Sequence, residues 1–230
     1  MAEIICVIGN KGGTGKTSLS HMLSQGLGLL GHRAACVLTD TAREPLDPAG
    51  RSYVTADART PESLDRVVAK LRTLENWIGI IDGGGNRSEM DKRLYALGDL
   101  VLLPFRESHE DIRTVMRDLE QFPRAYAVPT QWPANTWLRT AADRNVATLM
   151  HPYRHRILRP INALSATKLL LQRTVPKQMP TPLSNACRAV ARQTLELLEI
   201  DTGLASHGLI DIDVANRLPS DEMPLRCTQR

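Results

Sequence analysis

The chain has 230 residues and a formal net charge of +4, with 42% apolar, 4% aromatic and 23% charged residues. This balance is typical of a soluble globular domain, and no apolar run reaches the roughly 18 residues that a membrane span requires. The first residues, MAEIICVIGN, lack the basic flank of a signal peptide. The four cysteines are far apart without a CxxC pair, which argues against a disulfide scaffold and indicates a reducing cytoplasm.

Apolar runs of strand length alternate with helical patterns through most of the chain. A proline opens the helix expected at 61–75, and Ser108 precedes the helix expected at 108–122 as its cap. Residues 41–60 contain Pro, Gly and several charges, and we expect them to be irregular. In chain order, the patterns predict strands at 3–9, 33–39, 77–82, 99–105, 125–130 and 156–161, and helices at 16–31, 61–75, 88–97, 108–122, 137–150, 164–172 and 182–199.

This alternation predicts an α/β fold with a mainly parallel sheet and helices on both faces. We expect one domain at 1–200 and a C-terminal tail at 201–230. Within the tail, LIDIDV (209–214) alternates like a strand. The tail has five acidic and three basic residues, so it does not resemble a basic amphipathic membrane anchor. We therefore expect no membrane partner.

The turn after the first predicted strand, KGGTGKTS, carries the chemistry of a phosphate site. Its GKT matches the end of the P-loop pattern G-x-x-x-x-G-K-[ST], whereas Asn10 stands at the place of the first glycine. Glycines let successive backbone N–H groups turn towards a phosphate at the positive end of the following helix. Lys16 would contact the β- and γ-phosphates, and the Thr17 hydroxyl would bind Mg²⁺. The predicted cofactor-binding residues are Lys11, Gly12, Gly13, Thr14, Gly15, Lys16, Thr17 and Ser18.

The spelling KGGTGKTS resembles the deviant Walker A motif of the ParA/MinD family of dimeric ATPases. The resemblance implies a P-loop NTPase fold, ATP and Mg²⁺ as cofactors, and a homodimer that forms around ATP. It also implies that Lys11 is catalytic, crossing the dimer interface to contact the phosphates of the partner's ATP. A cation supplied in this way would neutralise charge that develops on the transferred phosphoryl group.

Acids at two predicted strand ends extend the resemblance. The family usually carries D-x-D after its second strand, where VLTDTA has Asp40 and then Ala42. A shift of two residues would make Asp40 the second acid, and in either register one carboxylate is missing. The resemblance implies a catalytic role for Asp40 in slow hydrolysis, and a Walker B role for Asp82, which would hold Mg²⁺ through water. The GGGN that follows Asp82 is either a nucleotide-sensing switch or a plain flexible turn.

Later segments resemble the family less specifically. Residues 99–122 are similar to its strand–switch–helix segment, and 156–167 are loosely similar to the segment near the adenine. The closest resemblance is to plasmid-borne, conjugation-associated proteins of VirC or StbB type. No winged-helix region precedes the P-loop, so we do not expect operator binding of the larger ParA type.

Basic residues are concentrated in one stretch, because residues 144–195 contain nine of them and no Asp or Glu. Such a stretch suits a phosphate backbone, where counterion release provides the affinity; the alternative is charge spread around a solvated surface. Family members bind DNA non-specifically through basic residues in their C-terminal half, which implies double-stranded DNA as a partner. Tyr153 is the only aromatic residue of the stretch, which argues against single-strand stacking. The candidate DNA-binding residues are Arg154, Arg156, Arg159, Arg188 and Arg192.

The resemblance therefore implies an ATPase, stimulated by a protein partner, that positions or segregates plasmid or chromosomal DNA or another cargo. Its expected location is the bacterial cytoplasm, on the nucleoid. The alternative is a nucleotide-dependent adaptor with little catalysis that recruits DNA-processing proteins in conjugative transfer, which the single acid favours. A nitrogenase-reductase-like electron carrier is not expected, because no cysteine lies just after the Walker B strand or the following strand, where a shared cluster would need it.

Overall fold

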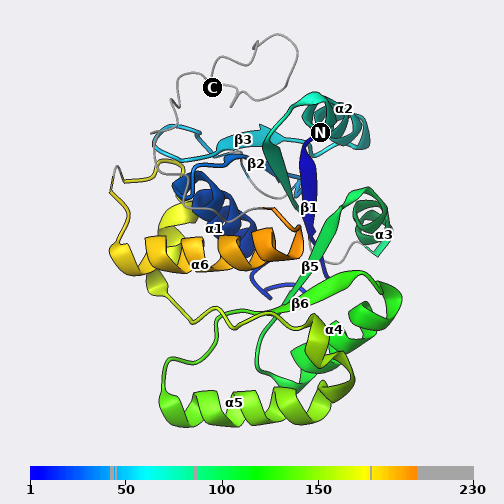
Figure 1. The fold of residues 1–230 in the computed structure, drawn as a ribbon, viewed down its shortest axis with the longest axis vertical. Helices are drawn as coiled ribbons and strands as arrows, with labels where there is room; N and C mark the ends of the chain where they lie inside the picture. The colour runs from blue at the N-terminus through cyan, green and yellow to red at the C-terminus, as the bar shows by residue number, and fades with distance from the viewer. Residues whose placement is uncertain (42–43, 45, 85–87, 177, 201–230) are drawn as a thin grey trace.

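A six-stranded sheet forms the centre of the computed structural model, which describes residues 1–41, 44, 46–84, 88–176 and 178–200 (Figure 1). The strand order is β3-β2-β4-β1-β5-β6, and every neighbouring pair is parallel. The predicted α/β class is confirmed. The strands are β1 (Glu3–Val7), β2 (Arg33–Leu38), β3 (Val54–Asp57), β4 (Trp77–Asp82), β5 (Leu100–Phe105) and β6 (Ala125–Pro129).

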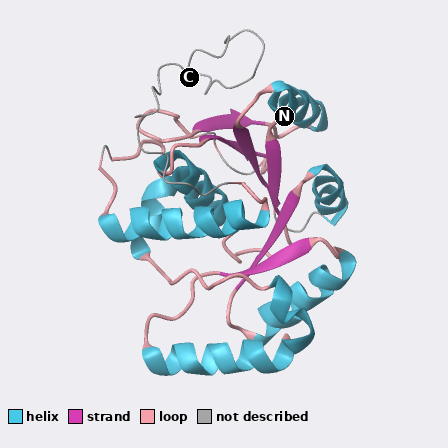
Figure 2. Cartoon of the chain, viewed as in Figure 1, coloured by secondary structure: helices cyan, strands magenta, loops and turns pink. Residues whose placement is uncertain are grey.

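Helices cover both faces of this sheet (Figure 2). One face packs against α1 and α6, and the other packs against α2, α3 and α4. Two short 3₁₀ helices, η1 and η2, follow α5. The bounds are α1 (Lys16–Leu29), α2 (Pro61–Thr73), α3 (Ser88–Leu97), α4 (His109–Gln121), α5 (Thr136–Leu149), η1 (His151–Arg156), η2 (Ser165–Leu171) and α6 (Thr181–Leu197).

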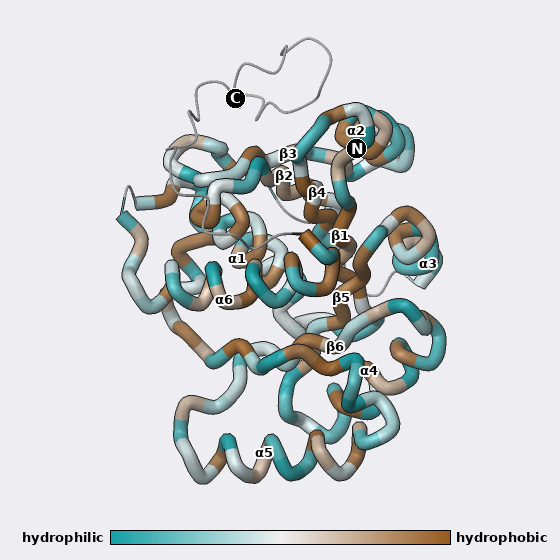
Figure 3. Tube along the Cα trace, in the orientation of Figure 1, coloured by the Kyte–Doolittle hydropathy of each residue, from teal (hydrophilic) through white to brown (hydrophobic). Residues whose placement is uncertain are grey.

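The central strands consist mainly of hydrophobic residues, which are brown in Figure 3. They are apolar on both faces because each face of the sheet is buried. In β1, Ile4 and Cys6 join the core beneath α2, α3 and α4, whereas Ile5 and Val7 join the core beneath α1 and α6. The alternation follows from the two-residue period of a strand. These two cores fix the carboxyl ends of the strands against the helices that follow them.

The sequence patterns missed one strand and over-extended another. The expected irregular segment 41–60 contains β3, a four-residue strand that pairs with β2 at the edge of the sheet formed by the described residues. The strand expected at 156–161 is reduced to a single bridge between Ala127 and Ile157, since η1 runs through Arg156 and Pro160 has no N–H to continue a ladder. The helix expected at 164–172 is the 3₁₀ helix η2.

Among the described residues, none of the helices combines the length and the apolar character that a membrane crossing needs. Cys6, Cys36 and Cys187 are buried with free thiols and pack as small core residues. The expected strand at 209–214 and the rest of the tail at 201–230 lie outside the described residues.

Candidate functional site

A cavity of about 350 Å³ opens at the carboxyl edge of the sheet. The parallel register places Asp82, the last residue of β4, level with Val7 of β1 and Leu38 of β2. Loops that leave these three strands therefore meet at one edge, which is the usual ligand position in an open α/β sheet. The lining consists of Gly12, Gly13, Gly15, Lys16, Thr17, Ser18, Asp40, Gly83, Gly84, Gln131 and Leu171.

The glycine-rich turn forms the floor of the cavity and leads into α1. Gly15 is the N-cap of α1 and has φ 94°, a left-handed conformation that a residue with a Cβ rarely adopts. Its lack of a side chain leaves no side-chain cap on the helix, so the first backbone N–H groups of α1 are available to an anion. The segment thus has the geometry of a phosphate-binding loop.

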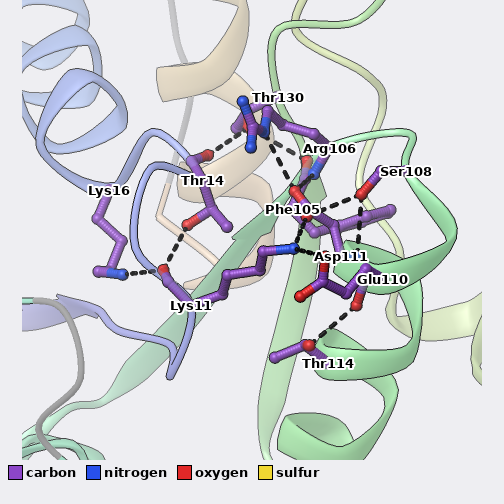
Figure 4. A network of polar contacts seen from close by, with 10 residues as sticks. All are labelled: Lys11, Thr14, Lys16, Phe105, Arg106, Ser108, Glu110, Asp111, Thr114 and Thr130. Carbon is purple, nitrogen blue, oxygen red and sulfur yellow. Dashed lines mark hydrogen bonds and ion pairs between the residues drawn. The ribbon is translucent and has the colours of Figure 1, made fainter.

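Lys16 folds back over this loop. Its Nζ donates to the carbonyl oxygens of Gly9 at 2.9 Å and Lys11 at 2.7 Å, the second of which is drawn in Figure 4. The side chain is buried, and this burial lowers the pKa of its ammonium group, an effect that surrounding carboxylates, Asp91 and Asp82 first among them, oppose. The ammonium therefore lies beside the cavity, and its hydrogen bonds to described residues go to neutral oxygens that a phosphate can replace.

The residues expected to hold Mg²⁺ fit that role. Thr17 and Asp40 line the cavity, and the buried carboxylate of Asp82 accepts a 3.3 Å hydrogen bond from Ser20 Oγ one turn further along α1. Mg²⁺ commonly uses few protein oxygens and completes its shell with waters and phosphates. The Thr17 hydroxyl and, through water, Asp82 would supply these oxygens beside a bound nucleotide.

The GGGN segment begins where the end of β4 lies close to the end of β1. The backbone N–H of Gly83 donates to the carbonyl of Val7 at 2.9 Å, and a Cβ on Gly83 would lie 2.8 Å from that oxygen. Only glycine fits there without a shift of the backbone. Gly83 and Gly84 line the cavity, whereas 85–87 lie outside the described residues, so the choice between a switch and a plain turn stays open.

Lys11 and Thr14 are predicted cofactor-binding residues that do not line the cavity. Lys11 Nζ contacts Asp111 Oδ1 at 2.6 Å and Glu110 Oε2 at 3.0 Å at the start of α4 (Figure 4). Burial by itself would raise the pKa of the Asp111 carboxyl, but hydrogen bonds from the side chains of Lys11, Ser108 and Arg106 hold that pKa below the usual value. The carbonyl of Thr14 accepts a 2.6 Å hydrogen bond from the Thr130 hydroxyl. In this structure, Lys11 is therefore engaged within its own chain.

The departure at Asn10 has a structural explanation. Asn10 Nδ2 donates to Asp118 Oδ1 at 2.6 Å, and its backbone N–H donates to Oδ2 of the same carboxylate at 3.2 Å. Asp111 and Asp118 are seven residues apart, about two turns, so they lie on one face of α4. That face contacts two consecutive residues, Asn10 and Lys11, at the start of the P-loop. A helix that is distant in the sequence therefore holds the start of the loop in place.

The predicted DNA-binding arginines differ in their surroundings. The Arg156 guanidinium donates to backbone carbonyls at the end of α4 and the start of β6, so its side chain has a structural role. Arg159 forms an exposed 3.7 Å ion pair with Glu196 of α6. Arg154 and Arg192 are exposed, and Arg188 is half-buried. The carbonyls that Arg156 contacts are those of Leu119, Phe122 and Ala125.

Two lining residues, Gln131 and Leu171, were absent from the sequence prediction. Gln131 is the second residue after β6, so the rule that carboxyl ends of parallel strands share an edge could have found it. It has φ 52°, a strained value for a non-glycine residue, and its amide lies beside Gly15. Leu171 lies at the end of a 3₁₀ helix, and no motif marks it in the sequence.

Solved structures share this architecture, whereas no protein-family model and no curated protein matches the sequence. The McdA–ATP complex of Cyanothece is 16% identical, with a TM-score of 0.62 over 87% of this chain and 97% of that chain. The septum site-determining protein MinD of Pyrococcus horikoshii with Mg-ADP is 15% identical, with a TM-score of 0.63 over 86% and 98%. The chain has the MinD/ParA P-loop NTPase fold.

A putative plasmid partition protein of Borrelia burgdorferi bound to AMPPNP is also similar. It is 12% identical, with a TM-score of 0.59 over 84% of this chain and all of that chain. At such identities the likeness shows the fold alone. These structures are complexes with ATP, Mg-ADP and AMPPNP, so the same fold binds adenine nucleotides in those proteins.

Asp91 of α3 gives a pH-dependent prediction. Its carboxyl is buried near Lys16, and burial raises its pKa to about 6, although the Lys16 charge and the backbone N–H of Gly9 oppose the shift. A raised carboxyl pKa favours folding at low pH, and this contribution is lost as pH rises from about 4 to about 6. Asp91→Asn should therefore raise the melting temperature by a few degrees above pH 6 and leave it close to wild type below pH 4.

Thermal unfolding followed by circular dichroism from pH 3.5 to 8 measures this difference. Glu75→Gln, which removes an exposed carboxylate, is the control and should give a constant difference. A constant offset between Asp91→Asn and wild type across the range would contradict the assignment.

Proposed function

We propose that this chain is a ParA/MinD-type ATPase that binds ATP and Mg²⁺ and dimerises around the nucleotides. The supporting observation is the cavity in which Gly15, Lys16 and Thr17 lie at the start of α1, beside Asp40 and the buried Asp82. Backbone N–H groups, one ammonium group and carboxylates at a strand edge suit phosphates with a bound cation. Hydrolysis would give ADP and phosphate, with Asp40 as the acid that orients the attacking water.

We propose further that the dimer binds double-stranded DNA non-specifically and positions or segregates DNA or another cargo. The similar structures include a plasmid partition protein and a septum site-determining protein, both concerned with placement in the cell. The backbone N–H of Arg159 donates to Gln193 Oε1 of α6 at 2.8 Å, so the segment after η1 lies against α6. This contact brings basic residues of two elements to one region. A partner protein that stimulates hydrolysis is part of this proposal.

The alternative is a nucleotide-dependent adaptor with little catalysis, acting in conjugative transfer. It is favoured by the single acid at the end of β2, where Ala42 follows Asp40 at the place of the family's second acid. Turnover of ATP, with and without DNA, separates the two functions, because an adaptor would bind ATP and dimerise without measurable phosphate release.

Replacement of Lys16 tests the nucleotide site. Lys16→Ala should weaken Mg-ATP binding by at least about a hundredfold, because charge-assisted hydrogen bonds to the phosphates are lost. Isothermal titration calorimetry measures the affinity, and Lys92→Ala on the exposed side of α3 is the control. ATP affinity equal to wild type in folded Lys16→Ala protein would refute the proposed site.

Replacement of Lys11 tests the role across the dimer interface. Lys11→Ala should change ATP affinity by less than about threefold, but it should lose hydrolysis and weaken the ATP-dependent dimer, because no cation then reaches the partner's phosphates. Asp111→Asn is the matched variant, since it retains Lys11 and weakens its contact with α4.

In that variant, Lys11 is released from its own chain more easily, so ATP-dependent dimerisation should become stronger by severalfold. Phosphate release and sedimentation velocity with ATP measure the two effects. A Lys11→Ala protein with wild-type turnover would show that Lys11 acts only within the loop.

Charge reversal tests DNA binding. The triple variant Arg154→Glu, Arg188→Glu, Arg192→Glu should reduce DNA affinity at least tenfold and flatten its salt dependence, because each lost phosphate contact lowers the slope by about 0.9. Arg156 is unsuitable for this test, since its loss would unpair buried carbonyls. The control reverses Arg33, Arg66 and Arg117, which are exposed and lie outside the acid-free stretch.

The measurement is retention on DNA against salt, with a non-hydrolysable ATP analogue and with ADP. The analogue should give persistent binding, since two copies of the basic surface act jointly in a dimer. Equal losses in the test and control variants would show that net charge, not this surface, governs binding. Equal retention with both nucleotides would show that the nucleotide does not control DNA binding.

A further inference from the structure

Arg51, between β2 and β3, is almost completely buried, with 1% of its surface exposed. Its guanidinium donates to the carbonyl oxygens of Asp47 at 2.8 Å, Leu170 at 2.7 Å and Gln172 at 2.6 Å, and to the hydroxyl of Tyr53 at 2.9 Å. Within the described residues, no carboxylate forms an ion pair with it. A buried charge that neutral oxygens alone satisfy is costly, which indicates that its geometry serves more than the packing of a surface loop.

Two of these carbonyls flank Leu171, which lines the cavity at the carboxyl edge of the sheet. The rigid fork of the guanidinium spans both carbonyls and so holds the backbone on each side of Leu171. The segment ends the 3₁₀ helix η2, whose hydrogen-bond geometry is poorer than that of an α-helix, so bonds from a side chain to its carbonyls contribute more to its position. Arg51 therefore sets the position of this wall of the cavity.

The same network reaches α1. The Tyr53 hydroxyl, which accepts from Arg51, is also hydrogen bonded to His21 Nδ1 at 2.7 Å, and His21 lies on α1, the helix that follows the P-loop. The network thus ties the wall that carries Leu171 to the helix that carries Lys16 and Thr17. One end of the network is beside Leu171 and the other is on α1, and both of these segments line the cavity.

Leu171 differs in chemistry from the rest of the lining. Apart from Gln131, the other residues are glycines, Lys16, two hydroxyl residues and Asp40, which suit phosphates and Mg²⁺. A leucine side chain offers nothing to a phosphate, but it can pack against the flat apolar face of a base. The nucleoside end of the ligand is therefore expected against Leu171, with the Gln131 amide nearby.

We propose that Arg51 is a positioning residue for nucleoside recognition: it holds Leu171 as the apolar wall for the base of the nucleotide. The proposal rests on the proposed nucleotide site and adds to it the part of the chain that distinguishes a nucleoside triphosphate from a bare polyphosphate. The probes that separate these two contributions are Mg-ATP and Mg-tripolyphosphate, which has neither base nor ribose.

Arg51→Met in the full chain should weaken Mg-ATP binding about tenfold and change Mg-tripolyphosphate binding by less than about twofold, because only the base contact is lost. Leu171→Ala should have the same effect with the Arg51 network intact. Arg51→Lys should also lose the preference for ATP, since one ammonium group cannot span the two carbonyls. Calorimetry measures both affinities for each variant.

Matched controls lie away from the cavity. Arg124 also donates to a backbone carbonyl and stacks on a tyrosine, Tyr95, so Arg124→Met tests the loss of a similar arginine. Leu164→Ala tests the loss of a leucine at the other end of η2. Both should leave the two affinities within about twofold of wild type.

Equal weakening of both probes, or of neither, in folded Arg51→Met or Arg51→Lys would overturn the proposal. If neither Arg51 variant folds, Leu171→Ala decides, and an unchanged preference for ATP overturns the proposal. Wild-type protein that binds neither probe would instead refute the nucleotide site itself, and the inference would fall with it. Wild-type protein that binds both probes with equal affinity would retain a phosphate site but refute nucleoside recognition.

Discussion

The burial of the Lys16 ammonium beneath the glycine-rich turn is the constraint on which the site depends. Taking this charge out of water lowers its pKa, and the carbonyls of Gly9 and Lys11 must replace the lost hydration. The turn can present those carbonyls only because its glycines adopt left-handed conformations. A phosphate would replace the carbonyls with a charged partner, so the burial of the ammonium favours an anionic ligand.

Helix α4 provides a second support for the same loop. Asp118 contacts Asn10 and Asp111 contacts Lys11, so two carboxylates on one face of a distant helix hold consecutive residues of the turn. The proposed dimer requires Lys11 to leave Asp111, whereas Asn10 can stay in place. Movement of one side chain would therefore change the surface offered to a partner without loss of the P-loop conformation.

The sequence predicted most of the fold, because the elements around the site carry strong local signals. The buried strands β1, β2 and β4 are continuous apolar runs, α2 begins at the expected proline, and α4 follows the expected cap Ser108. Strand β3 was missed since four residues at a sheet edge, next to Pro and Gly, have no pattern of their own. A strand was wrongly predicted at 156–161 because apolar and polar residues alternate there, whereas η1 and Pro160 prevent a ladder of hydrogen bonds with β6.

The sequence by itself predicted the phosphate-binding loop and a phosphate-bearing ligand, since a glycine turn, a lysine and a hydroxyl residue act locally at a strand-to-helix junction. It also marked Asp40 and Asp82 as strand-end acids through the family resemblance, and the parallel register then brings these strand ends to one edge. Only the tertiary structure decided that Arg156 is bound to carbonyls, that Lys11 is held by α4, and that Arg51 binds the carbonyls on both sides of Leu171. These contacts join residues more than 30 positions apart, and no local pattern in a single sequence encodes such pairings.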